Sequence, residues 1–214
     1  MRKISITIVA VILCSILTVL IVKQINFHNY KTSYKITKEQ IEKRILINEI
    51  TNAINKDCFF KTISDKEEAE KYITNYYRPT KYEDVVEELT RAELIKAILA
   101  SENRTIDYNL SKQSTYSGFE QMKTEESQAR YYESVKTVLP AFNLNEEEYL
   151  ELLYDYGYDL NNKTEFNRWF IKESGYYEDK SDPELVQAEE YPGWEEQVEA
   201  YIDKAMKKVS VEIE

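Results

Sequence analysis

Two hydrophobic patterns divide the chain: an unbroken apolar run at its start and periodic apolar positions over the rest. Residues 4–22 form the run, which holds 19 residues without a charge and is bounded by Lys3 and Lys23. A helix needs about 20 apolar residues to cross a bilayer, whereas the apolar part of a cleaved signal peptide has about 7–15. The run therefore predicts an uncleaved transmembrane signal anchor over residues 1–23.

The charges on either side of this run bear on its orientation. Arg2 and Lys3 favour a cytoplasmic N-terminus, whereas Lys23 and Lys31 after the run pull the other way. The overall form is that of a signal anchor. We therefore expect a single-pass protein of the cell membrane, contacting the membrane through residues 4–22, with a cytoplasmic N-terminus and an extracytoplasmic C-terminal domain.

The rest of the chain divides into a predicted tether, residues 24–32, and a predicted extracytoplasmic domain, residues 33–214. Apolar and polar residues alternate with a period of two over residues 30–36 and again over residues 209–213, which predicts two short strands. An isolated strand leaves its hydrogen-bonding edges unpaired. The two strands are therefore expected to pair and to bring both ends of the domain together.

Helix-start signals fill the residues between the two strands. Thr37, Ser64 and Thr80 each stand three residues before a Glu or Gln, the arrangement of a capping box. Asn145 with Glu148 opens a later helix in the same way. The predicted fold class is thus mainly α: a multi-helix domain with a small two-strand pairing of its N- and C-terminal ends, preceded by one transmembrane helix.

Glycines suggest where two of the later helices end. The helix opened by Asn145 is predicted to stop at Gly157, because glycine is the usual residue just after a helix. Aromatic residues from Phe166 onward predict a separate helix that ends near Gly175. A last helix is predicted to begin at Trp194.

Composition limits the chemistry of the domain. The 28 basic residues stand against 39 acidic ones, so the net charge is -11 and a nucleic-acid partner is not expected. The chain has one histidine, His28, and two cysteines, Cys14 and Cys58, which removes most His-based catalysis and His-ligated metal sites. We expect no catalytic residue, no metal and no cofactor.

One enzymatic alternative rests on Glu173. The residues 173–176 (ESGY) resemble the E-S-G-aromatic signature of lytic transglycosylases, in which a glutamic acid protonates a glycosidic oxygen. The glycine-rich segment that follows in that family is absent, and a glycine after a helix end explains the same residues. A cell-wall glycosidase using Glu173 is therefore kept as an alternative.

Tyrosine is abundant, with 18 residues. Some tyrosines fall on helical stripes and are predicted core residues: Tyr72, Tyr76, Tyr149, Tyr156 and Tyr201. Others cannot all be inside: Tyr131, Tyr132, Tyr154, Tyr158, Tyr176 and Tyr177. Exposed tyrosine offers a large, rigid contact area, so these residues indicate a binding surface, with ordinary partial exposure as the alternative.

The order of these elements resembles a known family. The matching segments are residues 34–41 (YKITKEQI), residues 143–149 (NLNEEEY), and a Trp-led helix that runs into a strand, residues 194–198 (WEEQV) through residues 209–213 (VSVEI). Together, across roughly residues 33–214, they look like the helical N-terminal domain of SurA-type and PrsA-type extracytoplasmic chaperones, in the short form that lacks the parvulin module.

The resemblance implies non-enzymatic binding of unfolded exported polypeptides in a groove between helices. It carries no residue motif, so the peptide-binding residues stay unknown at this point. A structural subunit of a cell-envelope complex, with one dedicated envelope protein as partner, is the main alternative. A wide groove would favour many clients, and one flat apolar patch would favour a single partner.

Overall fold

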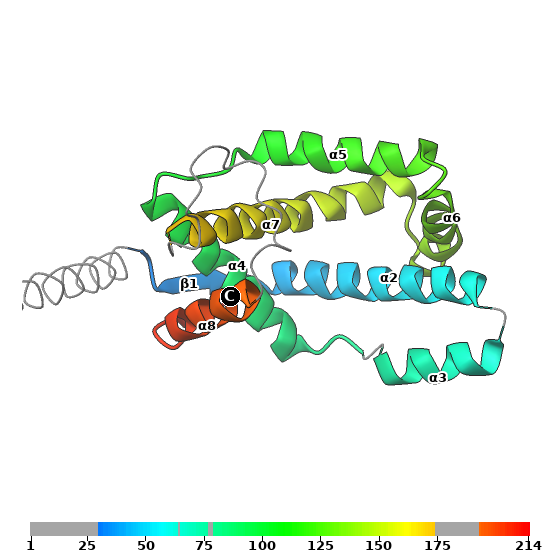
Figure 1. The fold of residues 1–214 in the computed structure, drawn as a ribbon, viewed down its shortest axis with the longest axis horizontal. Helices are drawn as coiled ribbons and strands as arrows, with labels where there is room; N and C mark the ends of the chain where they lie inside the picture. Colours follow the sequence, from blue (N-terminus) through cyan, green and yellow to red (C-terminus); the bar gives the residue numbers. More distant parts are fainter. Residues whose placement is uncertain (1–29, 64, 77–78, 174–192) are drawn as a thin grey trace, which may run out of the picture.

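The fold is described from a computed structural model of the chain (Figure 1). The structure describes residues 30–63, 65–76, 79–173 and 193–214. These residues are mainly helical, and their two short strands form a parallel pair, which confirms the helical class and the predicted pairing. The predicted anchor, residues 1–23, lies outside the described residues; among the helices within them, none is long and apolar enough to span a bilayer.

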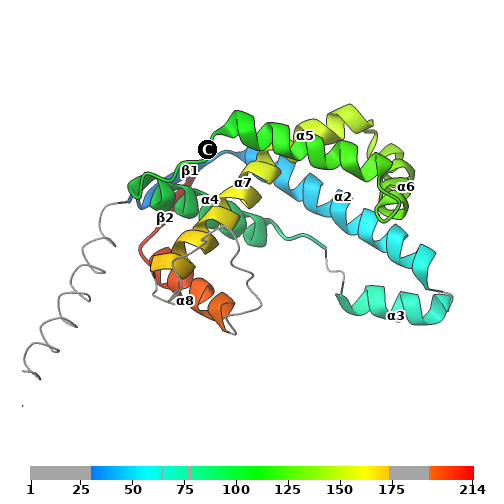
Figure 2. The same cartoon turned by 45° about the horizontal axis from the view of Figure 1, so that its top comes forward.

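The elements follow one another along the chain as β1 (Ser33–Ile36), α2 (Lys38–Thr62), α3 (Lys66–Tyr76), α4 (Tyr82–Ser101), α5 (Tyr108–Thr124), α6 (Ala129–Val138), the short 3-10 helix η1 (Leu139–Phe142), α7 (Glu146–Glu173), α8 (Trp194–Met206) and β2 (Ser210–Ile213). In Figure 1, α7 runs through the middle of the molecule, with α5 on one side and α2 on the other. The helix α6 closes one end of this layer, and α4, α8 and the strands lie at the other end. Figure 2 shows α3 alongside α2 and apart from the remaining helices.

The strand pair joins the two ends of the domain. Tyr34 is in register with Val211, and Ile36 with Ile213. The pairing continues past both strand ends, because the N–H of Ser210 donates to the carbonyl of Thr32 at 2.9 Å and the N–H of Glu214 donates to the carbonyl of Ile36 at 3.1 Å.

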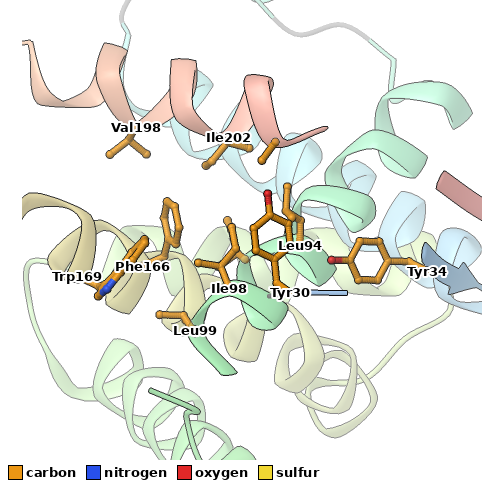
Figure 3. Close-up of a cluster of buried hydrophobic side chains, with 11 residues drawn as sticks. Tyr30, Tyr34, Leu94, Ile98, Leu99, Phe166, Trp169, Val198 and Ile202 are labelled. Carbon is orange, nitrogen blue, oxygen red and sulfur yellow. The ribbon is translucent and has the colours of Figure 1, made fainter. Parts of the chain in front are cut away.

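One apolar cluster lies beside the strands, between α4, α8 and the C-terminal half of α7. Phe166 of α7 is fully buried there against residues of α4 and α8. Tyr30 is 7% exposed, and its ring lies between Leu94, Ile98 and Ile202 (Figure 3). The packing of the domain thus includes Tyr30, a residue inside the range that the sequence pattern assigns to the tether.

A second apolar cluster lies at the far end, between α2, α5, α6 and the N-terminal half of α7. Ile50 and Ile54 of α2 are buried there with Val135 of α6 and Tyr149 of α7. Because α7 contributes to this cluster and to the one beside the strands, it links these two clusters.

The helix α7 does not stop at Gly157, so that prediction is wrong. It runs without a break for 28 residues and includes Phe166, which the sequence pattern had placed in a separate helix. The reason for the glycine is the approach of α5: a Cβ at position 157 would lie 2.2 Å from Oγ1 of Thr115. Gly157 therefore permits close helix packing and does not terminate a helix.

The predicted helix starts are correct in part. The capping box at Thr37 and the reciprocal bonds between Asn145 and Glu148 are both formed. The box predicted at Thr80 is wrong, because α4 begins two residues later and its N-cap residue, Lys81, makes no side-chain capping bond.

The start of α3 is capped by Asp65. Its carboxylate accepts the N–H groups of Glu67 at 2.9 Å and Glu68 at 3.2 Å. The predicted capping residue, Ser64, lies outside the described residues, and Asp65 meets the need of the first turn for an acceptor.

Gly157→Ala should destabilise the domain by about 1–3 kcal/mol, because Thr115 must move and lose its bond to the carbonyl of Ser111. Chemical denaturation measures this change. Gly118→Ala is the matched control: nothing lies within 4 Å of a Cβ there, so the better helix propensity should stabilise by about 0.5–1 kcal/mol. Equal effects of the two substitutions would contradict the close approach of α5 and α7.

Candidate functional site

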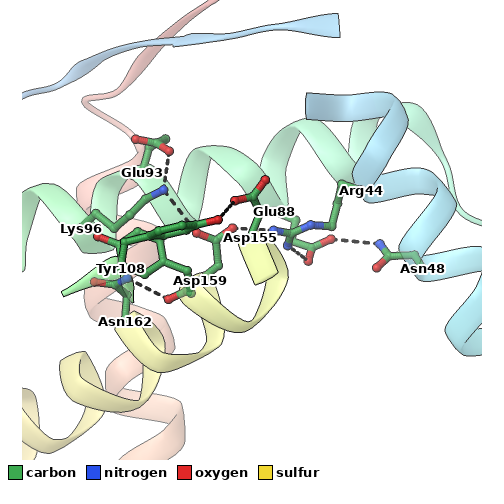
Figure 4. A network of polar contacts seen from close by, with 10 residues as sticks. Arg44, Asn48, Glu88, Glu93, Lys96, Tyr108, Asp155, Asp159 and Asn162 are labelled. Atoms are coloured by element: carbon green, nitrogen blue, oxygen red, sulfur yellow. Dashed lines mark hydrogen bonds and ion pairs between the residues drawn. The ribbon is translucent and has the colours of Figure 1, made fainter. Parts of the chain in front are cut away.

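A buried polar network holds α2, α4 and α7 together at the middle of α7. Arg44 of α2 is 4% exposed, and its guanidinium pairs with Glu88 of α4 at 2.5 Å and with Asp159 of α7. Figure 4 shows Arg44 reaching both carboxylates, with Asn48 donating to the second oxygen of Glu88. A guanidinium suits this position because its rigid fork can satisfy two carboxylates at once.

A second cation completes the network. Nζ of Lys96 lies 2.5 Å from Glu93 and 3.2 Å from Asp159, so Asp159 stands between two cations. Burial alone would lower the pKa of Lys96, but Asp159 and Glu93 outweigh it and the pKa is raised. The pKa of Arg44 is raised in the same way, with burial opposed by Glu88 and Asp159. Arg44 and Lys96 therefore stay charged, and the network of ion pairs connects α2, α4 and α7.

The network also fixes the start of α5. The ring of Tyr158, with Nζ of Lys96 5.6 Å from its centroid, packs edge-on against Tyr108 of α5 at 5.1 Å. The hydroxyl of Tyr108 donates to Asp155 of α7 at 2.8 Å (Figure 4). Tyr108 is thus held by an aromatic contact and a hydrogen bond although 40% of it is exposed.

Aromatic and charged side chains continue from Tyr108 along the seam between α5 and α7. Lys112 lies 4.2 Å from the ring centroid of Tyr154 and 3.7 Å from Glu151, and Tyr116 is 49% exposed. Residues four apart share one side of a helix, which aligns Tyr108 with Lys112 and Tyr116. We call the set formed by these residues the tyrosine strip: Tyr108, Lys112 and Tyr116 on α5, with Glu147, Glu151, Tyr154, Asp155 and Tyr158 on α7.

The helix α5 is the outermost helix of this layer. Within its 17 residues, all of which the structure describes, Ser111 and Phe119 are buried, whereas Leu110 is 64% exposed. Small residues attach it to α7: Thr115 faces Gly157, and Asn161 donates to the hydroxyl of Ser111 at 2.6 Å. Three of the large apolar and aromatic side chains of α5 remain exposed: Tyr108, Leu110 and Tyr116.

Two tyrosines of the strip, Tyr108 and Tyr154, stay neutral phenols at physiological pH. Burial, followed by the hydrogen bond to Asp155, raises the pKa of Tyr108 to about 12. Burial and the nearby Glu151 and Tyr116 also raise the pKa of Tyr154. Each hydroxyl therefore keeps its proton and its capacity to donate a hydrogen bond.

The structure divides the tyrosines differently from the sequence pattern. Tyr154 is buried, and Tyr131, Tyr132 and Tyr158 are half-buried, so this group contributes less surface than expected. Of the predicted core tyrosines, Tyr149 is buried and Tyr156 and Tyr201 are half-buried, while the side chains of Tyr72 and Tyr76 are not described. Tyr176 and Tyr177 lie outside the described residues.

The exposed tyrosines of α5 were missed by the sequence reasoning. Tyr108 and Tyr116 were not singled out, although a signal for them exists. They stand eight residues apart with Lys112 between them, beside the row of Ser111, Thr115 and Phe119 that faces α7 and the core. In a helical projection of residues 108–124 the two rows lie on adjacent sides of the helix, and Tyr116 stands farthest from the buried row.

The remaining candidate residues lie apart from the strip. Glu173 is the last residue of α7 and is exposed, and the residues 174–176 of its motif lie outside the described part of the chain. Cys58 is a half-buried free thiol of α2, and His28 is not among the described residues. Within those residues there is no group of three His, Cys, Asp or Glu side chains that could hold a metal ion.

The comparisons with known proteins identify no relative of this chain. No family model matches the chain, and neither a curated protein nor a solved structure matches it.

Arg44→Met should destabilise the domain by about 3 kcal/mol, because Glu88 loses its cation and the carboxylate of Asp159 keeps only Lys96. Denaturant titration measures the loss. Lys43→Met is the matched control, since its neighbouring pair with Glu39 is exposed and should contribute nothing measurable. A small loss of stability in Arg44→Met would show that the network does not stabilise the packing of the three helices.

Proposed function

We propose that this protein is a membrane-anchored, extracytoplasmic, chaperone-like protein that binds exported polypeptides and is not an enzyme. Residues 4–22 hold it in the membrane with its N-terminus in the cytoplasm. The tyrosine strip forms the binding surface. A client lies along this side of α5 and contacts its exposed aromatic side chains.

The exposure of large apolar side chains on α5 is the observation that carries this proposal. Tyr108 is 40% exposed and Tyr116 is 49% exposed. Scattered single apolar residues are ordinary on a protein surface, but these two tyrosines stand two helical turns apart on one side of α5, with Lys112 between them. Tyrosine is enriched in binding surfaces because it buries a large area at low entropic cost.

The support beneath the strip favours binding as well. Tyr108 is held by Asp155 and Tyr158, and the ring of Tyr158 rests on the buried network through Lys96. A surface already ordered before a partner arrives loses less entropy on binding. The strip therefore needs little rearrangement to receive a client.

The family resemblance is a second support. A helical domain that opens on a strand and ends on a Trp-led helix followed by a strand is the order of elements on which the resemblance to SurA-type and PrsA-type N-terminal domains rests. On this proposal the protein is a short form of that family without an isomerase module.

Photo-crosslinking of the full-length chain in lipid nanodiscs tests the proposal. A benzoylphenylalanine at Tyr116 should crosslink a permanently unfolded, carboxymethylated model protein several-fold more than the same probe at Tyr82. Tyr82 is the matched control because it is 42% exposed at the start of α4, away from the strip. Equally low yields at both positions would refute client binding by α5.

The same probe separates the proposal from its main alternative. Crosslinking in intact cells should give many products of different mass if the protein receives many exported clients. A single discrete product would instead assign the strip to one dedicated envelope protein, as in a structural subunit of an envelope complex.

A further inference from the structure

We infer that the tyrosine strip selects cationic segments of its clients, in which Lys or Arg stands beside an apolar or aromatic residue. This inference rests on the proposed function and specifies the chemistry of the partner. It is carried by the acidic residues that accompany the exposed tyrosines.

Three carboxylates form a line along the strip side of α7. Glu147, Glu151 and Asp155 are spaced four residues apart, and all three are exposed. Glu147 and Glu151 both act on Tyr154, whose pKa is raised by burial and then by these neighbouring charges. The line therefore lies beside the aromatic rings on the same face of the molecule.

The strip itself has a surplus of negative charge. Its basic residue, Lys112, is shared between Glu151 and the ring of Tyr154. Within the strip three carboxylates stand against one ammonium, and Glu147 forms no ion pair with another described residue. Outside the strip, Lys43 of α2 interacts electrostatically with Asp155.

The rings of the strip already hold cations. Lys112 lies 4.2 Å from the ring centroid of Tyr154, and Lys96 lies 5.6 Å from that of Tyr158. These distances fall within the range in which a ring face attracts an ammonium or guanidinium. Tyr108 and Tyr116 offer further exposed ring surface to a cation from outside.

Charge complementarity then decides between kinds of partner. Carboxylates beside aromatic rings attract Lys and Arg and repel acidic peptides, anionic headgroups and phosphate backbones. The net charge of -11 of the whole chain acts in the same direction at longer range. A cationic polypeptide segment with apolar neighbours satisfies both components of the strip.

Three fluorescent peptides test the selection. They share the same apolar residues, and the positions between these are all Lys in the first peptide, all Gln in the second and all Glu in the third. Each is titrated against the full-length chain in nanodiscs of neutral lipid. The Lys peptide should bind at least about tenfold more tightly than the Gln peptide, and its affinity should fall with salt. The Glu peptide should bind most weakly. Equal affinities for the Lys and Gln peptides, or tighter binding of the Glu peptide, would overturn the inference.

Single substitutions place the effect on the strip. Glu147→Gln should weaken binding of the Lys peptide by about threefold and reduce the salt dependence of that binding, without changing the affinity for the Gln peptide. Glu42→Gln is the matched control, because Glu42 is an exposed residue of α2 outside the strip, and it should change neither peptide. If both substitutions act equally, the selection arises from net charge and not from the strip.

The failure of this inference differs from the failure of the proposed function. If none of the peptides binds and the probe at Tyr116 captures no unfolded protein, the proposed function itself is wrong. If the peptides bind and crosslink at Tyr116 without regard to charge, the proposed function stands and the cationic selection is wrong.

Discussion

The shared pairing of Arg44 with Glu88 and Asp159 is the interaction on which the arrangement of the long helices depends. Apolar contacts alone would let α2, α4 and α7 slide along one another, whereas a buried charge is satisfied at one register only. The two apolar clusters lie on either side of this register. Because Asp159 also receives Lys96, the same register positions Tyr158 and, through it, the outer helix α5.

The helix α7 turns this local constraint into a property of the whole domain. Its first half packs with α2, α5 and α6, its middle carries the polar network, and its second half packs with α4 and α8. Its outer side meets α5 through Gly157 and Asn161, so that α5 needs few buried residues of its own. Because few side chains of α5 are needed to hold it against α7, most of its other side chains remain exposed.

Local signals in the sequence predicted the elements whose determinants are local. The capping boxes at Thr37 and Asn145 could be predicted because such a box involves only four neighbouring residues, although the same local pattern at Thr80 does not form a cap. Gly157 was misinterpreted because its role is set by Thr115 on another helix. The same reason explains the strip: the exposure of Tyr116 and the burial of Tyr154 depend on which helix lies beside which, and a single-helix pattern does not contain that information.

The pairing of β1 with β2 has a consequence for the order of folding. The two strands lie at opposite ends of the domain sequence, and Tyr30 and Tyr34 pack against α8, the last helix. Contacts of such high sequence separation form late and slowly, because the intervening loop must close first. During synthesis β1 therefore stays unpaired until β2 has been made. The strand pair can close only after every helix between the two strands is available to pack, so closure of the domain follows the synthesis of all of them.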